Sequence, residues 1–118
     1  TGKFPAVSRI SGNTIKRFFE TGYTSQMPGT EAGSNKIKKT FSPCYGSPFM
    51  PRKIELYTNM LMEKVKNTNA NVFLINTGMG PNGNRFPLEF TRNCVKQAMT
   101  TKYDDRSEEV LEILEGLL

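Results

Sequence analysis

Apolar side chains recur with a helical period in separate stretches of this chain, and polar residues fill the positions between them. In the first stretch, Ile15, Phe18 and Phe19 fall at positions i, i+3 and i+4, which is typical of one face of an amphipathic helix. Gly22 follows and suits a helix end. The same periodicity predicts helices at about 14–21, 51–67, 88–101 and from 104 to the end.

Each of the three later helices carries a line of side chains that we expect to face a core. These lines are Ile54, Tyr57, Leu61 and Val65, then Leu88, Thr91, Val95 and Met99, and last Val110, Leu111, Leu114, Leu117 and Leu118. Pro51 suits the first position of the second helix. Ser107 is the expected cap of the last one, with Glu108 and Glu109 near its positive end.

One continuous apolar run, Val72–Ile75, stands between polar residues. Such a run predicts a strand that is buried on both faces, as in a parallel sheet. A glycine-rich loop at 76–84 follows directly, while residues 1–10 read as extended or loop. Helix followed closely by strand indicates an α/β fold. A single strand cannot form a sheet, so its partner strands must be unrecognised here or belong to chain outside this sequence.

Residues 25–39 are rich in polar residues, glycine and proline, and they hold almost no apolar side chains. A polar loop of this length inside a compact domain is uncommon unless it serves as a lid or a binding loop. A plain disordered linker explains the composition equally well.

The chain carries 16 lysines and arginines against 11 acidic residues, for a net charge of +5. No basic run is dense or interleaved with aromatic residues, so a nucleic-acid groove is not expected. A phosphate-rich small ligand, an acidic protein partner or simple solubility accounts for the charge. No apolar run approaches the roughly 20 residues of a membrane span, and no targeting segment is visible.

The two cysteines, Cys44 and Cys94, stand far apart, and the chain has no histidine. A zinc site or a nucleophile paired with histidine is therefore nearly excluded within this sequence. Two isolated thiols favour a reducing compartment, which allows the cytoplasm or the mitochondrial matrix.

The loop at 76–84 could bring backbone amides close to a phosphate, since glycines there permit a near approach. It matches neither the P-loop nor the dinucleotide fingerprint, so a tight structural turn is the alternative. Arg85 follows the loop, and its planar guanidinium could pair with phosphate or stack on a base. A solvated arginine or a structural ion pair is the alternative for Arg85.

Several motifs occur in order: "PAVSRIS" at 5–11, "TGYTSQMPGTEAG" at 21–33, "TFSPCYGSPFM" at 40–50, "NVFLINTG" at 71–78 and "GNRFPLEFTR" at 83–92. Together, at this spacing, they resemble the C-terminal part of ATP-dependent phosphoenolpyruvate carboxykinases. The resemblance covers about residues 1–99. It implies a partial mononucleotide-binding C-terminal lobe at 1–101, followed by a helical tail at 102–118 that departs from the family.

The resemblance also implies ligands and site residues. Arg85, Phe86 and Thr91 match positions that contact the nucleotide in that family, so ATP is the expected cofactor. The family's mobile lid corresponds to about 29–40. The matching lid residues are Gly29, Thr30, Glu31 and Gly33. Cys44 matches a cysteine with an expected packing role. The family's P-loop and its Mg²⁺ and Mn²⁺ ligands have no counterpart in this chain, which supplies no catalytic residue and no metal ligand of its own.

Some positions depart from the family pattern. They are Ala32 in place of arginine, Met79 in place of tryptophan, Pro81 in place of glycine, Asn84 in place of lysine and Phe90 in place of aspartate. The loss of a lysine at position 84 and the gain of Pro81 are expected to weaken a phosphate-facing loop.

Two interpretations stay open. The chain is a segment of a working carboxykinase, which turns oxaloacetate and ATP into phosphoenolpyruvate, CO₂ and ADP, and its partner is then the remainder of that enzyme. Alternatively, it is a degenerate, non-catalytic relative that serves as a structural subunit among other proteins of a larger assembly. Thr1 in place of an initiating methionine fits a cut, processed or partly recorded chain.

Overall fold

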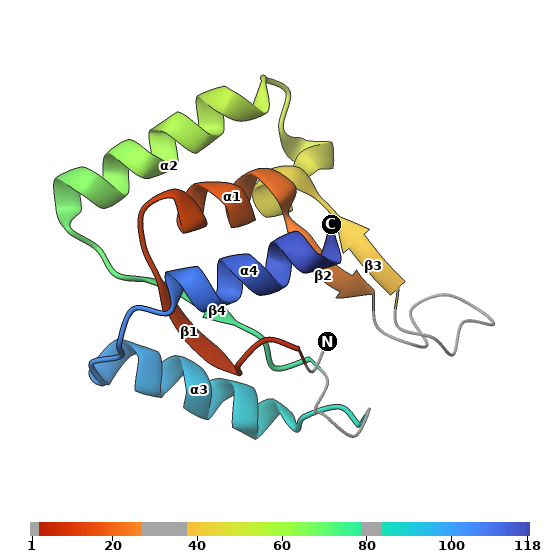
Figure 1. Ribbon diagram of the computed structural model, residues 1–118, viewed down its shortest axis with the longest axis vertical. Helices are drawn as coiled ribbons and strands as arrows, with labels where there is room; N and C mark the ends of the chain where they lie inside the picture. Colours follow the sequence, from red (N-terminus) through yellow and green to blue (C-terminus); the bar gives the residue numbers. More distant parts are fainter. Residues whose placement is uncertain (1–2, 27–37, 79–83) are drawn as a thin grey trace. The chain divides into compact units, whose positions relative to one another are not determined.

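The computed structural model describes residues 3–26, 38–78 and 84–118. It forms two compact units, one made of Thr1–Thr14 with Asn71–Leu118 and the other of Ile15–Ala70. Figure 1 shows their elements in chain order. They are β1 (Val7–Ile10), α1 (Asn13–Thr21), β2 (Tyr23–Gln26), β3 (Lys38–Phe41), the 3₁₀ helices η1 (Pro43–Tyr45) and η2 (Ser47–Phe49), α2 (Ile54–Thr68), β4 (Val72–Ile75), α3 (Leu88–Thr100) and α4 (Ser107–Leu117). Helices with short antiparallel ladders give an α+β fold.

The strand predicted at Val72–Ile75 is present as β4, but its partner is β1, from the segment expected to be extended or loop. The two strands pair antiparallel, with Val7 opposite Ile75 and Ile10 opposite Val72. The expectation of a parallel sheet is therefore wrong for the described residues. A continuous apolar run reports burial rather than strand direction, which depends on the partner that the chain brings alongside.

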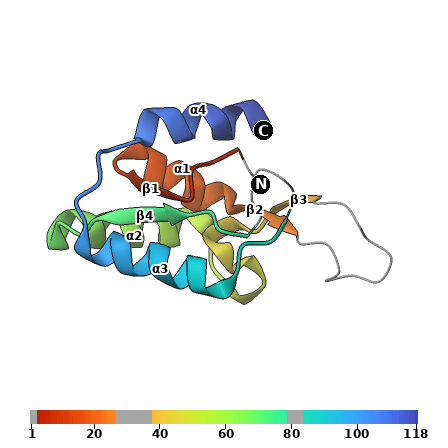
Figure 2. The same cartoon turned by 90° about the horizontal axis from the view of Figure 1, so that it is seen from below.

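Within the first unit, α4 and α3 lie on opposite sides of the β1–β4 ladder (Figure 2). Val110 and Leu114 of α4 are fully buried, and Leu117 is nearly so. This agrees with the apolar line predicted for the last helix, except that Leu118 is exposed. Burial of a Leu or Val side chain stabilises a fold by about 1.5–3 kcal/mol, so α4 is a main part of this unit's core.

The apolar line predicted for α3 is largely wrong, because Leu88, Val95 and Met99 are exposed. The most buried side chain of α3 is Cys94. The side of α3 that carries Cys94 packs inward, in place of the line given by its apolar periodicity.

In the second unit, β2 and β3 pair antiparallel, with Tyr23 opposite Phe41 and their rings 5.7 Å apart in an edge-to-face contact. Residues 25, 26, 38 and 39 are thus in strands, although they were predicted to be loop. The sequence gives no strand signal here because these residues are all polar. A short ladder that contains one aromatic cross-strand pair can form without alternating apolar residues.

Helix α1 ends as predicted at Gly22, which has a positive φ of 57° and whose amide donates to the Phe18 carbonyl. The Gly22 carbonyl accepts a hydrogen bond from the Ser42 amide at 3.0 Å. A Cβ at position 22 would lie 1.7 Å from the Ser42 carbonyl oxygen, so only glycine fits this close approach.

Helix α2 begins at Ile54, three residues later than Pro51, because Lys53 keeps an extended backbone. It ends at Thr68, where Asn69 adopts the left-handed conformation with φ of 53°. The predicted line is only half buried at Tyr57, Leu61 and Val65 and is exposed at Ile54, whereas Thr58 is fully buried. The Thr58 hydroxyl donates to the Ile54 carbonyl at 3.0 Å, which satisfies its polar atom inside the core.

Candidate functional site

The candidate site lies where β4 ends. Thr77 follows the strand and is buried, and its hydroxyl accepts a hydrogen bond from the Thr91 hydroxyl at 2.8 Å. Thr91 stands in the first turns of α3. This bond links the predicted nucleotide-contacting threonine directly to the end of the strand.

Arg85 and Phe86 are held at the same strand end. The Phe86 amide donates a hydrogen bond to the Gly78 carbonyl at 3.4 Å. Arg85 is exposed, and its guanidinium makes no ion pair with any residue among those the structure describes. The three predicted site residues Arg85, Phe86 and Thr91 therefore follow one strand end within the first unit.

The ring of Phe86 stacks on the ring of Phe90, with centroids 4.3 Å apart and planes inclined by 21°. Both side chains are half buried. In the sequence, Phe90 stands out only as a departure from the family pattern. The i, i+4 spacing of two aromatic residues at the start of a helix was the signal that could have found the pair.

Asn76, the first residue of the predicted phosphate-binding loop, has a structural role. Its amide N–H donates to the Ala6 carbonyl and its side-chain NH₂ donates to the Phe4 carbonyl, both at 2.9 Å. These bonds fix the segment before β1 against the strand end. The Asn76 side chain is thus engaged in a structural contact.

The predicted lid residues Gly29, Thr30, Glu31 and Gly33 lie outside the described residues, as do Ala32, Met79 and Pro81. The last residues of the predicted lid range, 38–40, belong to β3.

Cys44 is buried just after β3, within η1. Burial raises the pKa of its thiol, and the nearby Glu20 carboxylate raises it further. A thiol held neutral in this way packs as a small apolar side chain, in agreement with the role expected of Cys44. Cys94 is also buried, and both thiols are free.

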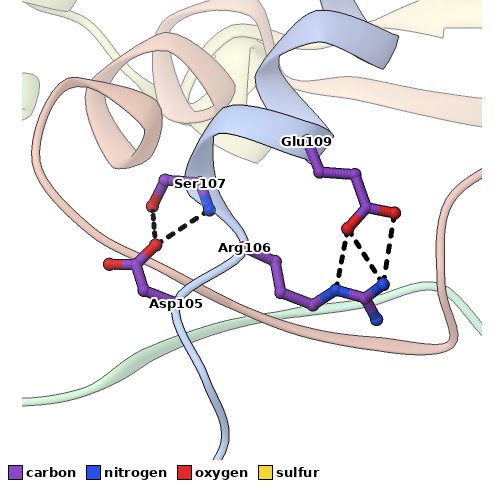
Figure 3. A network of polar contacts seen from close by, with 4 residues as sticks. All are labelled: Asp105, Arg106, Ser107 and Glu109. Carbon is purple, nitrogen blue, oxygen red and sulfur yellow. Dashed lines mark hydrogen bonds and ion pairs between the residues drawn. The ribbon is translucent and has the colours of Figure 1, made fainter.

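A polar network that the sequence did not predict joins the end of β1 to the start of α4. The Asp105 carboxylate accepts hydrogen bonds from the Ser11 and Ser107 hydroxyls and, at 2.8 Å, from the Ser107 amide. Figure 3 shows the contacts to Ser107 beside the Arg106–Glu109 ion pair. The bonds from Ser107 and Ser11 lower the pKa of Asp105.

This network corrects the expected role of Ser107. Ser107 is the first residue of α4, and its side chain does not cap the helix. Instead, the backbone amide of Ser107 donates a hydrogen bond to the Asp105 carboxylate. The network is therefore structural, and it fixes where α4 begins.

Within the described ranges, no group of three or more histidine, cysteine or acidic residues is placed to hold a metal ion. No described helix is long and apolar enough to cross a membrane. The described part of the site holds the exposed Arg85 guanidinium, the stacked rings of Phe86 and Phe90, and the hydroxyls of Thr77 and Thr91.

The described residues form a mixed helix–strand fold, with polar and aromatic groups gathered where β4 ends. Comparison with known families identifies the class: residues 1–115 match the family described as phosphoenolpyruvate carboxykinase, and the chain belongs to that family. The curated relatives it matches are the ATP-dependent enzymes.

The phosphoenolpyruvate carboxykinase (ATP) 1 of Moorella thermoacetica is 39% identical over 107 residues, which cover 87% of this chain. The phosphoenolpyruvate carboxykinase (ATP) of Shouchella clausii is 40% identical over 108 residues, and that of Bacillus subtilis is 39% identical over 108 residues. In each case the matched region is 20% of the relative's own length. The chain thus spans about one fifth of the length of these relatives.

Proposed function

We propose that this chain is a segment of an ATP-dependent phosphoenolpyruvate carboxykinase and supplies part of its adenine pocket. The reaction served would be the conversion of oxaloacetate and ATP into phosphoenolpyruvate, CO₂ and ADP. The observation that carries the proposal is the placement of Arg85, Phe86 and Thr91 at one strand end, in a chain that belongs to this family.

Each of these residues has chemistry suited to a nucleotide. The Arg85 guanidinium can pair with phosphate or stack on a base. The Phe86 ring has one face against Phe90, so its other face is the one on which adenine would stack. The Thr91 hydroxyl donates its hydrogen bond to the Thr77 hydroxyl. The Thr91 oxygen still has lone pairs, which can accept a hydrogen bond from a ribose hydroxyl or from the adenine amino group.

The segment would not act alone. Membership of the carboxykinase family implies a divalent metal, and we propose that residues outside this chain hold the Mg²⁺ or Mn²⁺. Phosphoryl transfer depends on such metals and on positioned charges. The lid at about 29–40 would exclude water from the transfer step when it closes. A reducing compartment, either the cytoplasm or the mitochondrial matrix, suits the two free thiols.

Calorimetric titration of the full 118-residue chain with ATP tests the pocket. We expect saturable binding that Arg85→Ala weakens by about tenfold, the effect of losing one charge-assisted contact of roughly 1.4 kcal/mol. Arg52→Ala is the matched control, because it removes the same charge from an exposed arginine of the other unit. Equal affinity of the Arg85 and Arg52 variants would remove Arg85 from the pocket.

A second candidate function is that of a non-catalytic structural subunit of a larger assembly. It is favoured by the exposed apolar side chains of α3 and by Phe90, which replaces an aspartate of the family pattern. The native mass of the protein purified from its source discriminates the two. Stoichiometric association with unrelated subunits would favour this second function, and association with a chain carrying a P-loop and metal ligands would favour the first.

A further inference from the structure

The hydrogen bond between Thr91 and Thr77 has a direction, and this direction bears on what the pocket can recognise. A threonine hydroxyl offers one proton and two lone pairs. The Thr91 hydroxyl donates its proton to the Thr77 oxygen at 2.8 Å. Thr77 is buried, whereas Thr91 is only half buried. The proton of Thr91 is therefore directed into the protein, and the Thr91 oxygen has only lone pairs left to offer a ligand.

This arrangement differs from that of other threonines in the helices. The hydroxyls of Thr58, Thr68 and Thr100 each donate to the backbone carbonyl four residues earlier. That local bond is a common one for a threonine inside a helix. Thr91 donates instead to Thr77, which is 14 positions away and follows β4. The direction of the Thr91 proton is thus set by a tertiary contact.

The surroundings of Thr91 make an acceptor valuable for selecting a nucleotide. Phe90 precedes Thr91, and its ring stacks on Phe86 with centroids 4.3 Å apart. Stacking on an aromatic ring reads the flat face of a base and tolerates every base, so it selects weakly among them. The Arg85 guanidinium carries donors and no acceptor. Among the side chains of Arg85, Phe86 and Thr91, the acceptor is therefore the Thr91 oxygen.

We propose that Thr77 is a positioning residue for nucleotide selectivity. By accepting the Thr91 proton, Thr77 holds Thr91 as an acceptor, so the pocket favours a nucleotide that presents an N–H or O–H donor at this point. The amino group of adenine and the ribose 2′-hydroxyl both supply such a donor. A nucleotide with an acceptor there leaves two acceptors facing each other without a proton, which costs binding free energy. This inference rests on the proposed nucleotide pocket, and Thr77 acts only through Thr91.

Calorimetric titration of the full 118-residue chain with three nucleotides tests the inference. They are ATP, inosine triphosphate, which has a carbonyl oxygen in place of the adenine amino group, and 2′-deoxy-2′-fluoro-ATP, which has fluorine in place of the ribose 2′-hydroxyl. We expect the chain to prefer ATP by about tenfold over the analogue that has lost the donor bound by Thr91. The analogue that shows this preference identifies the base or the ribose as the source of the donor.

Variants of Thr77 show whether that residue sets the preference. Thr77→Val keeps the shape and removes the acceptor, so the Thr91 hydroxyl can turn and donate, and the preference for ATP should fall to about threefold or less. Thr77→Ser keeps the hydroxyl and should retain the preference. Thr77→Ala removes the acceptor by a second route, should Thr77→Val fail to fold. Circular dichroism verifies folding, and Thr100→Val is the control in the same helix.

The ratio of affinities separates this role from a merely structural one, because a loss of stability alone weakens all three nucleotides alike. Three results would overturn the inference: equal affinity of the parent chain for ATP and both analogues, a preference that persists unchanged in Thr77→Val, and a preference that Thr77→Ser loses as fully as Thr77→Val. Failure of the parent chain to bind ATP would refute the pocket and the inference together. ATP binding that Arg85→Ala weakens, with a preference indifferent to Thr77, would refute the inference alone.

Discussion

The Thr91 hydroxyl and the Thr77 hydroxyl lie 2.8 Å apart in a hydrogen bond that joins the first turns of α3 to the end of β4. Thr77 is buried, and this bond gives its hydroxyl oxygen a partner inside the protein. Thr91, which we expect to contact the nucleotide, thus also makes a tertiary contact between α3 and β4. Removing Thr91 would then change both stability and the pocket, and the two effects have to be measured separately.

The first prediction concerns this link. Thr91→Val and Thr77→Val should each lower the free energy of unfolding by about 0.5–1.5 kcal/mol, and the double variant should cost less than the sum, because both changes remove the same hydrogen bond. Urea unfolding followed by circular dichroism measures the cycle. Thr100→Val is the control in the same helix, since the Thr100 hydroxyl donates to the Lys96 carbonyl one turn away and to no other described residue. Strict additivity would contradict the link.

The second prediction separates two costs of replacing glycine. Gly12 and Gly22 both have φ of 57°, so alanine at either position meets the same backbone strain, of about 1–2 kcal/mol. Only at position 22 would the new Cβ lie 1.7 Å from the Ser42 carbonyl oxygen, whereas no atom lies within 4 Å at position 12.

Gly22→Ala should therefore destabilise the protein by at least about 3 kcal/mol, and Gly12→Ala by about 1 kcal/mol. Thermal unfolding of the two variants beside the parent chain gives both values. Similar losses at the two positions would show that the approach of Ser42 to Gly22 is not rigid.

The third prediction concerns pH. The hydrogen bonds from Ser107 and Ser11 lower the pKa of Asp105 below its ordinary value of 3.8. A carboxyl with a lowered folded-state pKa contributes stability that is complete above its unfolded pKa and is lost as the pH falls through the folded one. Asp105 should therefore stabilise the fold fully at neutral pH, and this contribution should decline as the pH falls below about 4.

Asp105→Ala tests this by removing the acceptor of the Ser107 amide. At pH 7 it should cost about 1 kcal/mol, as for other residues that satisfy the first amides of a helix, and the cost should shrink as the pH is lowered below 4. Asp104→Ala is the control, one position away. It removes the same charge, and among the described residues none forms a hydrogen bond or an ion pair with the Asp104 side chain. Denaturant unfolding at a series of pH values compares them, and parallel pH profiles would refute the role of Asp105.

Part of the candidate site was predictable from sequence and part was not. Arg85, Phe86 and Thr91 could be named because several motifs occur at matched spacing, and this information is local along the chain. Asp105 gave no signal, since its partner Ser11 is 94 positions away. The Phe86–Phe90 stack is an intermediate case, because its i, i+4 spacing was visible while its meaning depended on where α3 begins.

The amino-acid sequence by itself determined the helices, the strand at Val72–Ile75, the turn at Gly22 and membership of the carboxykinase family, because periodicity, turn residues and motif spacing are properties of neighbouring residues. Only the tertiary structure decided that β1 is the partner of β4, that their pairing is antiparallel and that α3 leaves Val95 and Met99 uncovered. Those outcomes depend on which distant segments meet and on how much apolar surface they can cover. An apolar pattern states that a surface needs covering, but it does not name the segment that covers it.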